Sequence, residues 1–97
     1  MQKGDIVTVI AMSGEYVGKF ITNDQNGLVI ENPRMILQNP ETGEMGFAQG
    51  VAVTGDQNPK EITFDQYIFI TPTNDKVATA WQDATSSIIT TKPKLVK

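Results

Sequence analysis

The chain has 97 residues, no cysteine, no histidine and a formal net charge of −3. A chain of this length forms one small domain, and the missing cysteine excludes disulfides and thiolate metal sites. Without histidine and cysteine it also lacks the commonest general base and the best nucleophile, so we expect no enzymatic activity. The acidic residues follow no metal-ligand spacing, so we expect no metal and no cofactor.

The first residues, Met1–Asp5, are polar, and the apolar run behind them is about seven residues long, too short for a membrane span. We therefore expect a cytoplasmic protein without membrane contact. The acidic balance is unlike the basic surface of a general nucleic-acid binder. A chain this small buries roughly 60–65% of its unfolded surface, so oligomerisation is a natural route to further burial.

Three apolar runs separated by tight turns open the chain. Asp5–Met12, Glu15–Thr22 and Gly27–Gln38 are rich in Val, Ile and Thr and predict three strands. Gly18 weakens a straight strand, so we expect the second strand to bend or bulge there. Pro33 has no N–H donor, so the third strand must be exposed, bulged or broken near that residue.

Turn signals divide the middle of the chain. The stretch 39–44 predicts a hairpin between Arg34–Gln38 and a strand over Met45–Thr54. This second arm contains small residues at alternate positions, which suits a curved wall or a contact between subunits. A further turn over 55–60 precedes one or two short strands, Ile62–Phe64 and Tyr67–Ile70.

One amphipathic helix is predicted over residues 74–89. Thr73 or Asn74 is its N-cap, and Asp75 lies in its first turn. Its apolar residues recur at helical spacing, and Trp81 either closes the open end of the fold as core or belongs to a partner-binding stripe. Residues 91–97 predict a basic flexible tail, which is either a solvated end or an arm that touches phosphates.

These elements together predict a mainly β fold. Residues 1–90 form one small, strongly bent, five-stranded antiparallel barrel of the SH3-like kind with a C-terminal amphipathic helix.

The second strand and its turn carry a recognisable motif. The run Gly18-Lys-Phe-Ile-Thr-Asn-Asp24 has the form Gly-x-apolar-x-x-x-Asp. In a bent three-stranded meander, this resembles the first motif of the Sm-like proteins, which form RNA-binding rings. Asp24 matches the family's loop acid, which orders the loop that grips a base. The family's Asn position is Leu28 here, and Asn26 can take its place if the loop is contracted.

The chain departs from the family in two other places. The second motif, apolar-Arg-Gly, is replaced by Ile70-Thr71-Pro72, which removes the guanidinium that normally contacts the base. Sm-like folds also carry their helix before the first strand, whereas Met1–Gly4 leaves no room for one. Compact, cysteine-free Sm-like proteins of this kind resemble those of phages, which would place this protein in a host-cell cytoplasm.

The resemblance implies a homo-oligomeric ring of about five to seven subunits. Such a ring would bind single-stranded RNA, or else DNA, with little base specificity in RNA or DNA processing. The alternative is a scaffold ring without nucleic-acid binding. The residues implied for nucleic-acid binding are Asn23, Asp24, Asn26, Thr71, Thr73, Lys19 and Arg34. The residues expected at the subunit interface are Phe47, Val51, Tyr67 and Phe69.

Two of these features have plainer interpretations. The run 23–27 is also what a tight turn needs, because Asn, Asp and Gly tolerate positive φ and bond their own backbone. Tyr16, Phe20, Tyr67 and Phe69 form either a stacking platform for bases or part of the core and the subunit contact.

Overall fold

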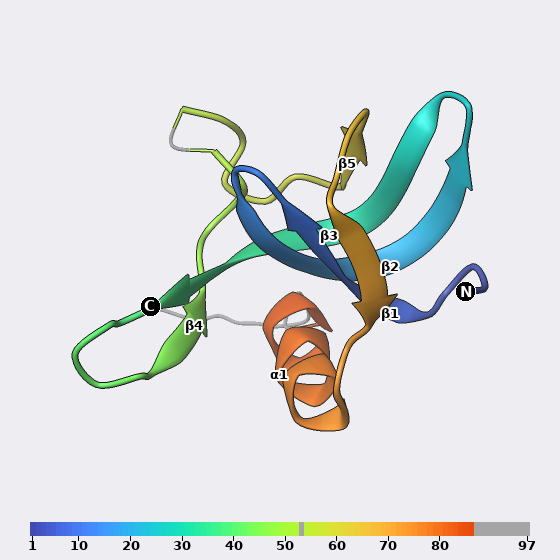
Figure 1. Cartoon of the computed structure of the whole chain (residues 1–97). Helices are drawn as coiled ribbons and strands as arrows, with labels where there is room; N and C mark the ends of the chain where they lie inside the picture. Colours follow the sequence, from blue (N-terminus) through green and yellow to red (C-terminus); the bar gives the residue numbers. More distant parts are fainter. Residues whose placement is uncertain (53, 87–97) are drawn as a thin grey trace.

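Six antiparallel strands and one helix make up the part of the chain that the computed structural model describes, residues 1–52 and 54–86 (Figure 1). The predicted mainly β fold is confirmed, with six strands in place of five. The elements are β1 (Ile6–Ala11), β2 (Gly14–Asp24), β3 (Gly27–Gln38), β4 (Met45–Phe47), β5 (Glu61–Phe64), β6 (Phe69–Pro72) and α1 (Asp75–Ser86).

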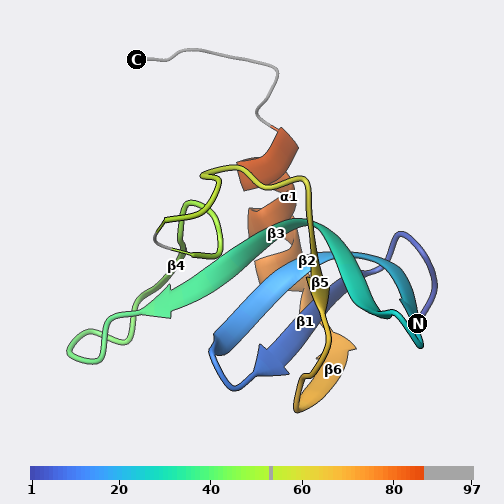
Figure 2. The same ribbon diagram turned by 90° about the horizontal axis from the view of Figure 1, so that it is seen from above.

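The strands pair in the order β4-β3-β2-β1-β6, and β5 pairs separately with β3. The last strand therefore returns to lie beside the first. The long strands β2 and β3 curve together across the molecule (Figures 1 and 2). The additional strand arises because β3 pairs with two short strands besides β2: Leu28–Glu31 pairs with β5, and Ile36–Gln38 pairs with β4.

A bulge separates the two halves of β3. Asn32 has a left-handed backbone with φ of 51°, and the β2–β3 register shifts between Val17 and Lys19. A Cβ on Gly18 would lie 2.9 Å from Ile30 Cδ1 and 3.0 Å from the Glu31 carbonyl oxygen. The glycine thus lets the two strands approach closely, and the predicted irregularities at Gly18 and Pro33 are both confirmed.

One face of the sheet carries the core. Val7, Val9, Leu28 and Ile30 are fully buried and pack with the rings of Tyr16 and Phe64, whose centroids are 5.1 Å apart. Alternation along β1 sends every second side chain to this face, as the period of a strand requires. Each fully buried aliphatic side chain stabilises the fold by about 1.5–3 kcal/mol.

Helix α1 lies against the opposite face, called here the helix face (Figure 1). It begins after Asn74, whose side-chain oxygen accepts a hydrogen bond from the Val77 N–H at 2.9 Å, so Asn74 is the N-cap. Trp81 is 3% exposed and donates its indole N–H to the Asn32 carbonyl at 3.0 Å, which confirms its predicted burial. The predicted end of the helix at residue 89 and the tail 91–97 lie outside the described residues.

The predicted strand over Met45–Thr54 is wrong beyond Phe47, where β4 ends. Gly50 has a φ of 77° and lies against the Asp56 backbone, so the chain turns back on itself there. Similarly, the predicted strand at Tyr67 begins two residues later, at Phe69. In the part of the chain that the structure describes, no helix is long and apolar enough to cross a membrane.

Candidate nucleic-acid loop and candidate subunit interface

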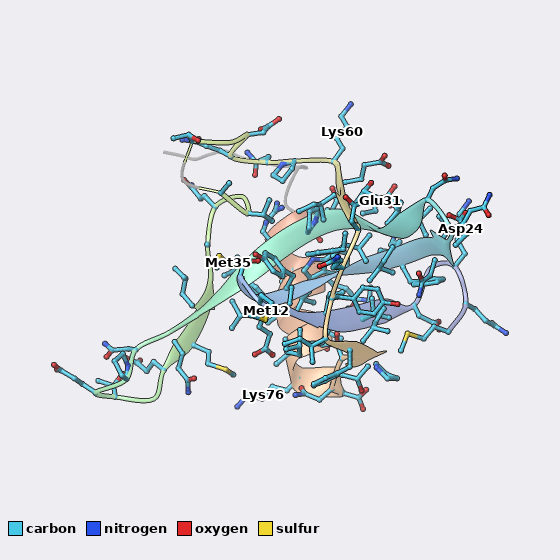
Figure 3. The ribbon with its side chains drawn as sticks, turned by 45° about the horizontal axis from the view of Figure 1, so that its top comes forward. Met12, Asp24, Glu31, Met35, Lys60 and Lys76 are labelled. Carbon is cyan, nitrogen blue, oxygen red and sulfur yellow. The ribbon has the colours of Figure 1, made fainter. Side chains whose placement is uncertain are left out.

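Asp24 organises the β2–β3 turn. Its carboxylate accepts hydrogen bonds from the Asn26 backbone N–H at 2.8 Å and from the Thr22 hydroxyl at 3.4 Å. The side chains of the turn are exposed, and Asp24 lies at its tip (Figure 3). The carboxylate orders the loop in the way expected of a loop acid, but an ordinary Asx turn makes the same bond.

Asn23 has a structural partner. Its side-chain amide donates to the Tyr67 hydroxyl at 2.7 Å and so ties the end of β2 to the segment between β5 and β6. Tyr67 is half-buried against the core. Asn23 was implied for nucleic-acid binding, but its side-chain amide instead links β2 to the segment before β6.

Two further residues of the predicted site, Thr71 and Thr73, lie at the end of β6, away from the β2–β3 turn. The Thr73 hydroxyl hydrogen-bonds the Thr8 hydroxyl at 2.8 Å, and the Thr73 N–H donates to the Ile6 carbonyl at 3.0 Å. Thr71 is exposed on β6 opposite Thr8. The β2–β3 turn and the end of β6 are separated in Figure 1, so one chain does not bring these two parts of the expected site together.

The two cationic residues of the expected site, Lys19 and Arg34, already have partners within the chain, and Arg34 is also partly buried. Lys19 lies 3.9 Å from Glu31 in an exposed ion pair, a kind of contact that contributes little to stability. Arg34 donates to the Pro33 carbonyl at 2.9 Å and to the Asn58 side-chain oxygen at 3.4 Å. Partial burial lowers the pKa of Arg34 from its ordinary value because it disfavours the charged form.

The charge of the described residues is strongly acidic. All eleven acidic residues lie within them, whereas three of the eight lysines and arginines, Lys92, Lys94 and Lys97, lie outside. No group of three or more acidic side chains in residues 1–52 and 54–86 could hold a metal ion. This part of the molecule therefore repels phosphates overall.

The aromatic residues do not line up as a platform for bases. Tyr16 is buried in the core, and Phe20 and Tyr67 pack against it. Phe69 differs, because its side chain is 52% exposed on β6. The core interpretation holds for the first three residues, and Phe69 is left as an exposed apolar group beside a sheet edge.

The free edge of β6 offers few backbone groups. In an antiparallel pair, residues with mutual hydrogen bonds alternate with residues whose backbone groups point away. The bond from Thr73 N–H to Ile6 fixes this alternation, so Ile70 and Pro72 direct their backbone groups away from β1. Pro72 has no N–H, which leaves Ile70 as the residue of this pair that offers both a donor and an acceptor.

The free edge of β4 follows from the same rule. Asn39 N–H bonds the Glu44 carbonyl and Ala48 N–H bonds the Met35 carbonyl, each at 2.8 Å. Residues 45 and 47 between these bonds therefore direct their backbone N–H and C=O groups away from β3. Among the described residues, no other segment pairs with this edge.

Exposed apolar side chains accompany both edges. Ile68 and Phe69 lie at the β6 edge, and Leu37 and Met45 lie near the β4 edge. An apolar groove of about 250 Å³ also separates β4 from α1. Its lining residues are Ile36, Met45, Gly46, Phe47, Asn74, Lys76, Val77 and Ala80.

The expected interface residues divide between edge and core. Phe47 lines the groove and Phe69 lies at the β6 edge, whereas Val51 and Tyr67 pack against the core of their own chain. Leu37 and Met45 at the β4 edge were not predicted from the sequence. Their signal is two apolar residues close to a predicted hairpin turn, where solvent would otherwise favour polar side chains.

No protein-family model matches this chain, and neither a curated protein nor a solved structure matches it.

Proposed function

We propose that this chain is a subunit of a closed homo-oligomeric ring that serves as a protein scaffold, with an Sm-like barrel as its fold. The observation that carries the proposal is a strand order that ends in a free edge on each side, β4 at one end and β6 at the other. Exposed apolar side chains accompany each edge, with Phe69 at one and Met45 at the other.

The difference between the two edges favours a ring. A free strand edge attracts another strand, and proteins normally cover such edges. Contact between two unlike surfaces is head to tail, and it closes into a ring when the rotation between copies allows. A core of this size gains stability from subunit contacts, and about five to seven copies agree with the Sm-like resemblance.

The strand order supports the Sm-like barrel. The last strand, β6, pairs with the first, β1, and strands β2 and β3 bend sharply at Gly18 and Asn32. A curved sheet whose last strand returns to its first is the arrangement of small SH3-like barrels.

Charge favours the scaffold over nucleic-acid binding. The described residues carry all the acidic side chains, and Lys19 is already paired with Glu31. Thr71 occupies the place where the family motif has arginine. A scaffold ring needs no cationic surface, so it agrees better with these residues.

Light scattering coupled to size exclusion tests the proposal. The parent at micromolar concentration should have about five to seven times the 10.6 kDa mass of the chain. Met45→Pro places a proline ring on the outward edge of β4, where it obstructs an approaching strand without breaking a β3–β4 bond, so it should reduce the assembly to monomers with an unchanged far-UV spectrum. Met45→Ala keeps the N–H and is the matched control. A parent that remains a monomer contradicts the proposal.

A second candidate function is weak binding of single-stranded RNA or DNA by the ring. The ordering of the β2–β3 turn by Asp24 favours it, because an ordered loop presents Asn26 at little entropic cost. Repetition around a ring strengthens a weak site by avidity. Binding should show little base preference and a shallow salt dependence, because few phosphates are neutralised.

Fluorescence anisotropy with oligo-U, oligo-A and single-stranded DNA at low and moderate salt tests this candidate. The variant that combines Asp24→Ala with Asn26→Ala should lose binding while its oligomeric mass is unchanged. Absence of binding to all three probes at low salt would rule out the nucleic-acid candidate, and the scaffold would remain as the proposed function.

A further inference from the structure

We propose that the groove between β4 and α1 receives β6 of the next copy, with Phe69 packed inside it. This inference rests on the proposed self-assembly and adds to it the register of the contact and the role of the helix. The occupant is a second copy of the chain because the chain itself carries a free strand edge that fits the groove in hydrogen bonding and in apolar character.

The groove has the walls that an added strand needs. Ile36 and Phe47 come from the sheet, and Val77 and Ala80 come from the helix. The free backbone groups of β4 form its third boundary. Extended segments bind such sites by joining the strand edge through backbone bonds while alternate side chains enter the apolar space.

The backbone groups of the two edges are complementary in number and spacing. Residues 45 and 47 point outward from β4, and Ile70 points outward from β6. In a parallel pair, one residue bonds the two residues that flank the position opposite it. Ile70 N–H would donate to the Met45 carbonyl, and Phe47 N–H would donate to the Ile70 carbonyl. Pro72, which has no N–H, ends this short pairing.

This register brings apolar side chains together on the helix face. Phe69 is opposite Ile10 and Thr71 is opposite Thr8, and Thr8 lies beside Val77 of the helix. Parallel pairing with Ile70 opposite Gly46 places Phe69 beside Met45 on this face. Phe69 is 52% exposed and Met45 is 60% exposed in the single chain, so both gain burial.

Gly46 removes an obstacle on the other face. A Cβ built on this residue has no atom within 4 Å, so the position opposite Ile70 is open. Lys76 lies at the helix side of the groove, at the lower end of the molecule in Figure 3. The helix thus covers the incoming strand. It can do so because α1 follows β6 in the chain and packs beside β4.

Disulfide cross-linking tests the register, because the chain has no cysteine of its own. Adjacent strands lie about 4.8 Å apart, within the roughly 4.4–6.8 Å between Cα atoms that a disulfide spans. The double variant Phe69→Cys with Met45→Cys should form a ladder of covalent oligomers on a non-reducing gel after mild oxidation. Both positions are more than half exposed, so the changes should leave the fold intact.

Two control variants separate the outcomes. Phe69→Cys with Leu37→Cys should not form the ladder, because Leu37 is opposite Gly46 and its side chain alternates to the other face. Phe69→Cys alone should stay uncoupled, since a head-to-tail contact does not bring two copies of one residue together.

Failure of the register differs from failure of the assembly. A ladder from the Leu37 variant overturns the inference and leaves self-assembly standing. The same holds if the Met45 variant forms no ladder although light scattering shows that this variant is oligomeric. If light scattering shows that the parent is a monomer, both the register and the self-assembly are overturned.

Discussion

The two halves of β3 contain similar apolar residues but have opposite surroundings. In the first half, Leu28 and Ile30 are fully buried between β2 and β5. In the second half, Leu37 is 54% exposed beside the short strand β4. Residue type therefore does not decide burial along this strand. The strands and the helix that lie beside each half decide it.

The functional argument depends on this difference. The first half has found its partners within the chain and forms the core. The second half pairs with β4, whose outer edge is free and borders the apolar groove, and these are features of a surface that another strand covers. The following predictions test this contrast, and stability is compared at one protein concentration because assembly would otherwise change it.

The largest effect is expected at the junction of the two halves. Trp81 packs there and donates its indole N–H to the Asn32 carbonyl. Trp81→Ala should lower the free energy of unfolding by about 3–5 kcal/mol, as removal of a buried aromatic ring does. Urea unfolding followed by circular dichroism measures it, with Gln82→Ala on the exposed side of the helix as the control. A variant as stable as the parent would show that α1 does not hold the junction.

A matched pair of substitutions compares the halves directly. Leu28→Ala should cost about 2–5 kcal/mol because it opens a cavity in the core. Leu37→Ala changes the same side chain at an exposed position and should stay within about 0.5 kcal/mol. Both values come from urea unfolding in the Met45→Pro background, where strand addition is blocked. Equal losses would contradict the division of β3 into a core half and an edge half.

The two glycines give a smaller contrast. Gly18→Ala places a Cβ against Ile30 and the Glu31 carbonyl, and this crowding should cost about 1–3 kcal/mol. Gly46→Ala meets no atom within 4 Å and should change stability by less than about 0.5 kcal/mol. Thermal unfolding in the same background measures both. A neutral Gly18→Ala would mean that the strands can separate at the bulge.

The smallest effect is expected at the start of the helix, beside the groove. Asn74→Ala removes the acceptor of the Val77 N–H and should cost about 1 kcal/mol. Asn74→Asp keeps an acceptor there and should be nearly neutral. Chemical unfolding of the two variants distinguishes capping from a role of the side chain in the groove. A loss in both variants would point to the groove.

Local sequence signals predicted the elements whose causes are local. Alternation of Val and Ile predicted β1, and Gly18 and Pro33 predicted the bend and the bulge. The sequence placed the helix start at Thr73 or Asn74, and Asn74 is the cap. Each of these depends on the conformational limits of one residue or on its neighbours in sequence. The same reasoning overextended β4, because small residues over Met45–Thr54 are compatible with a strand and equally with a turn at Gly50.

The candidate site was predictable in its parts but not in its assembly. Asp24 orders its turn as the motif implies, since that bond spans two residues. The partner of Asn23 is Tyr67, 44 residues further along the chain, and no local pattern indicates that contact. Long-range pairing of the strands set this contact and separated the turn from Thr71 and Thr73.

By itself, the sequence determined that this protein is a small, cysteine-free, mainly β domain with one capped helix and an acidic charge. These properties follow from composition and from chain geometry over a few residues. The tertiary structure alone decided that α1 lies across the sheet, that β3 pairs with both β4 and β5 besides β2, and that Phe69 and Met45 remain exposed. Those outcomes depend on contacts between distant segments, whose free energies arise from the pairing and burial of whole elements.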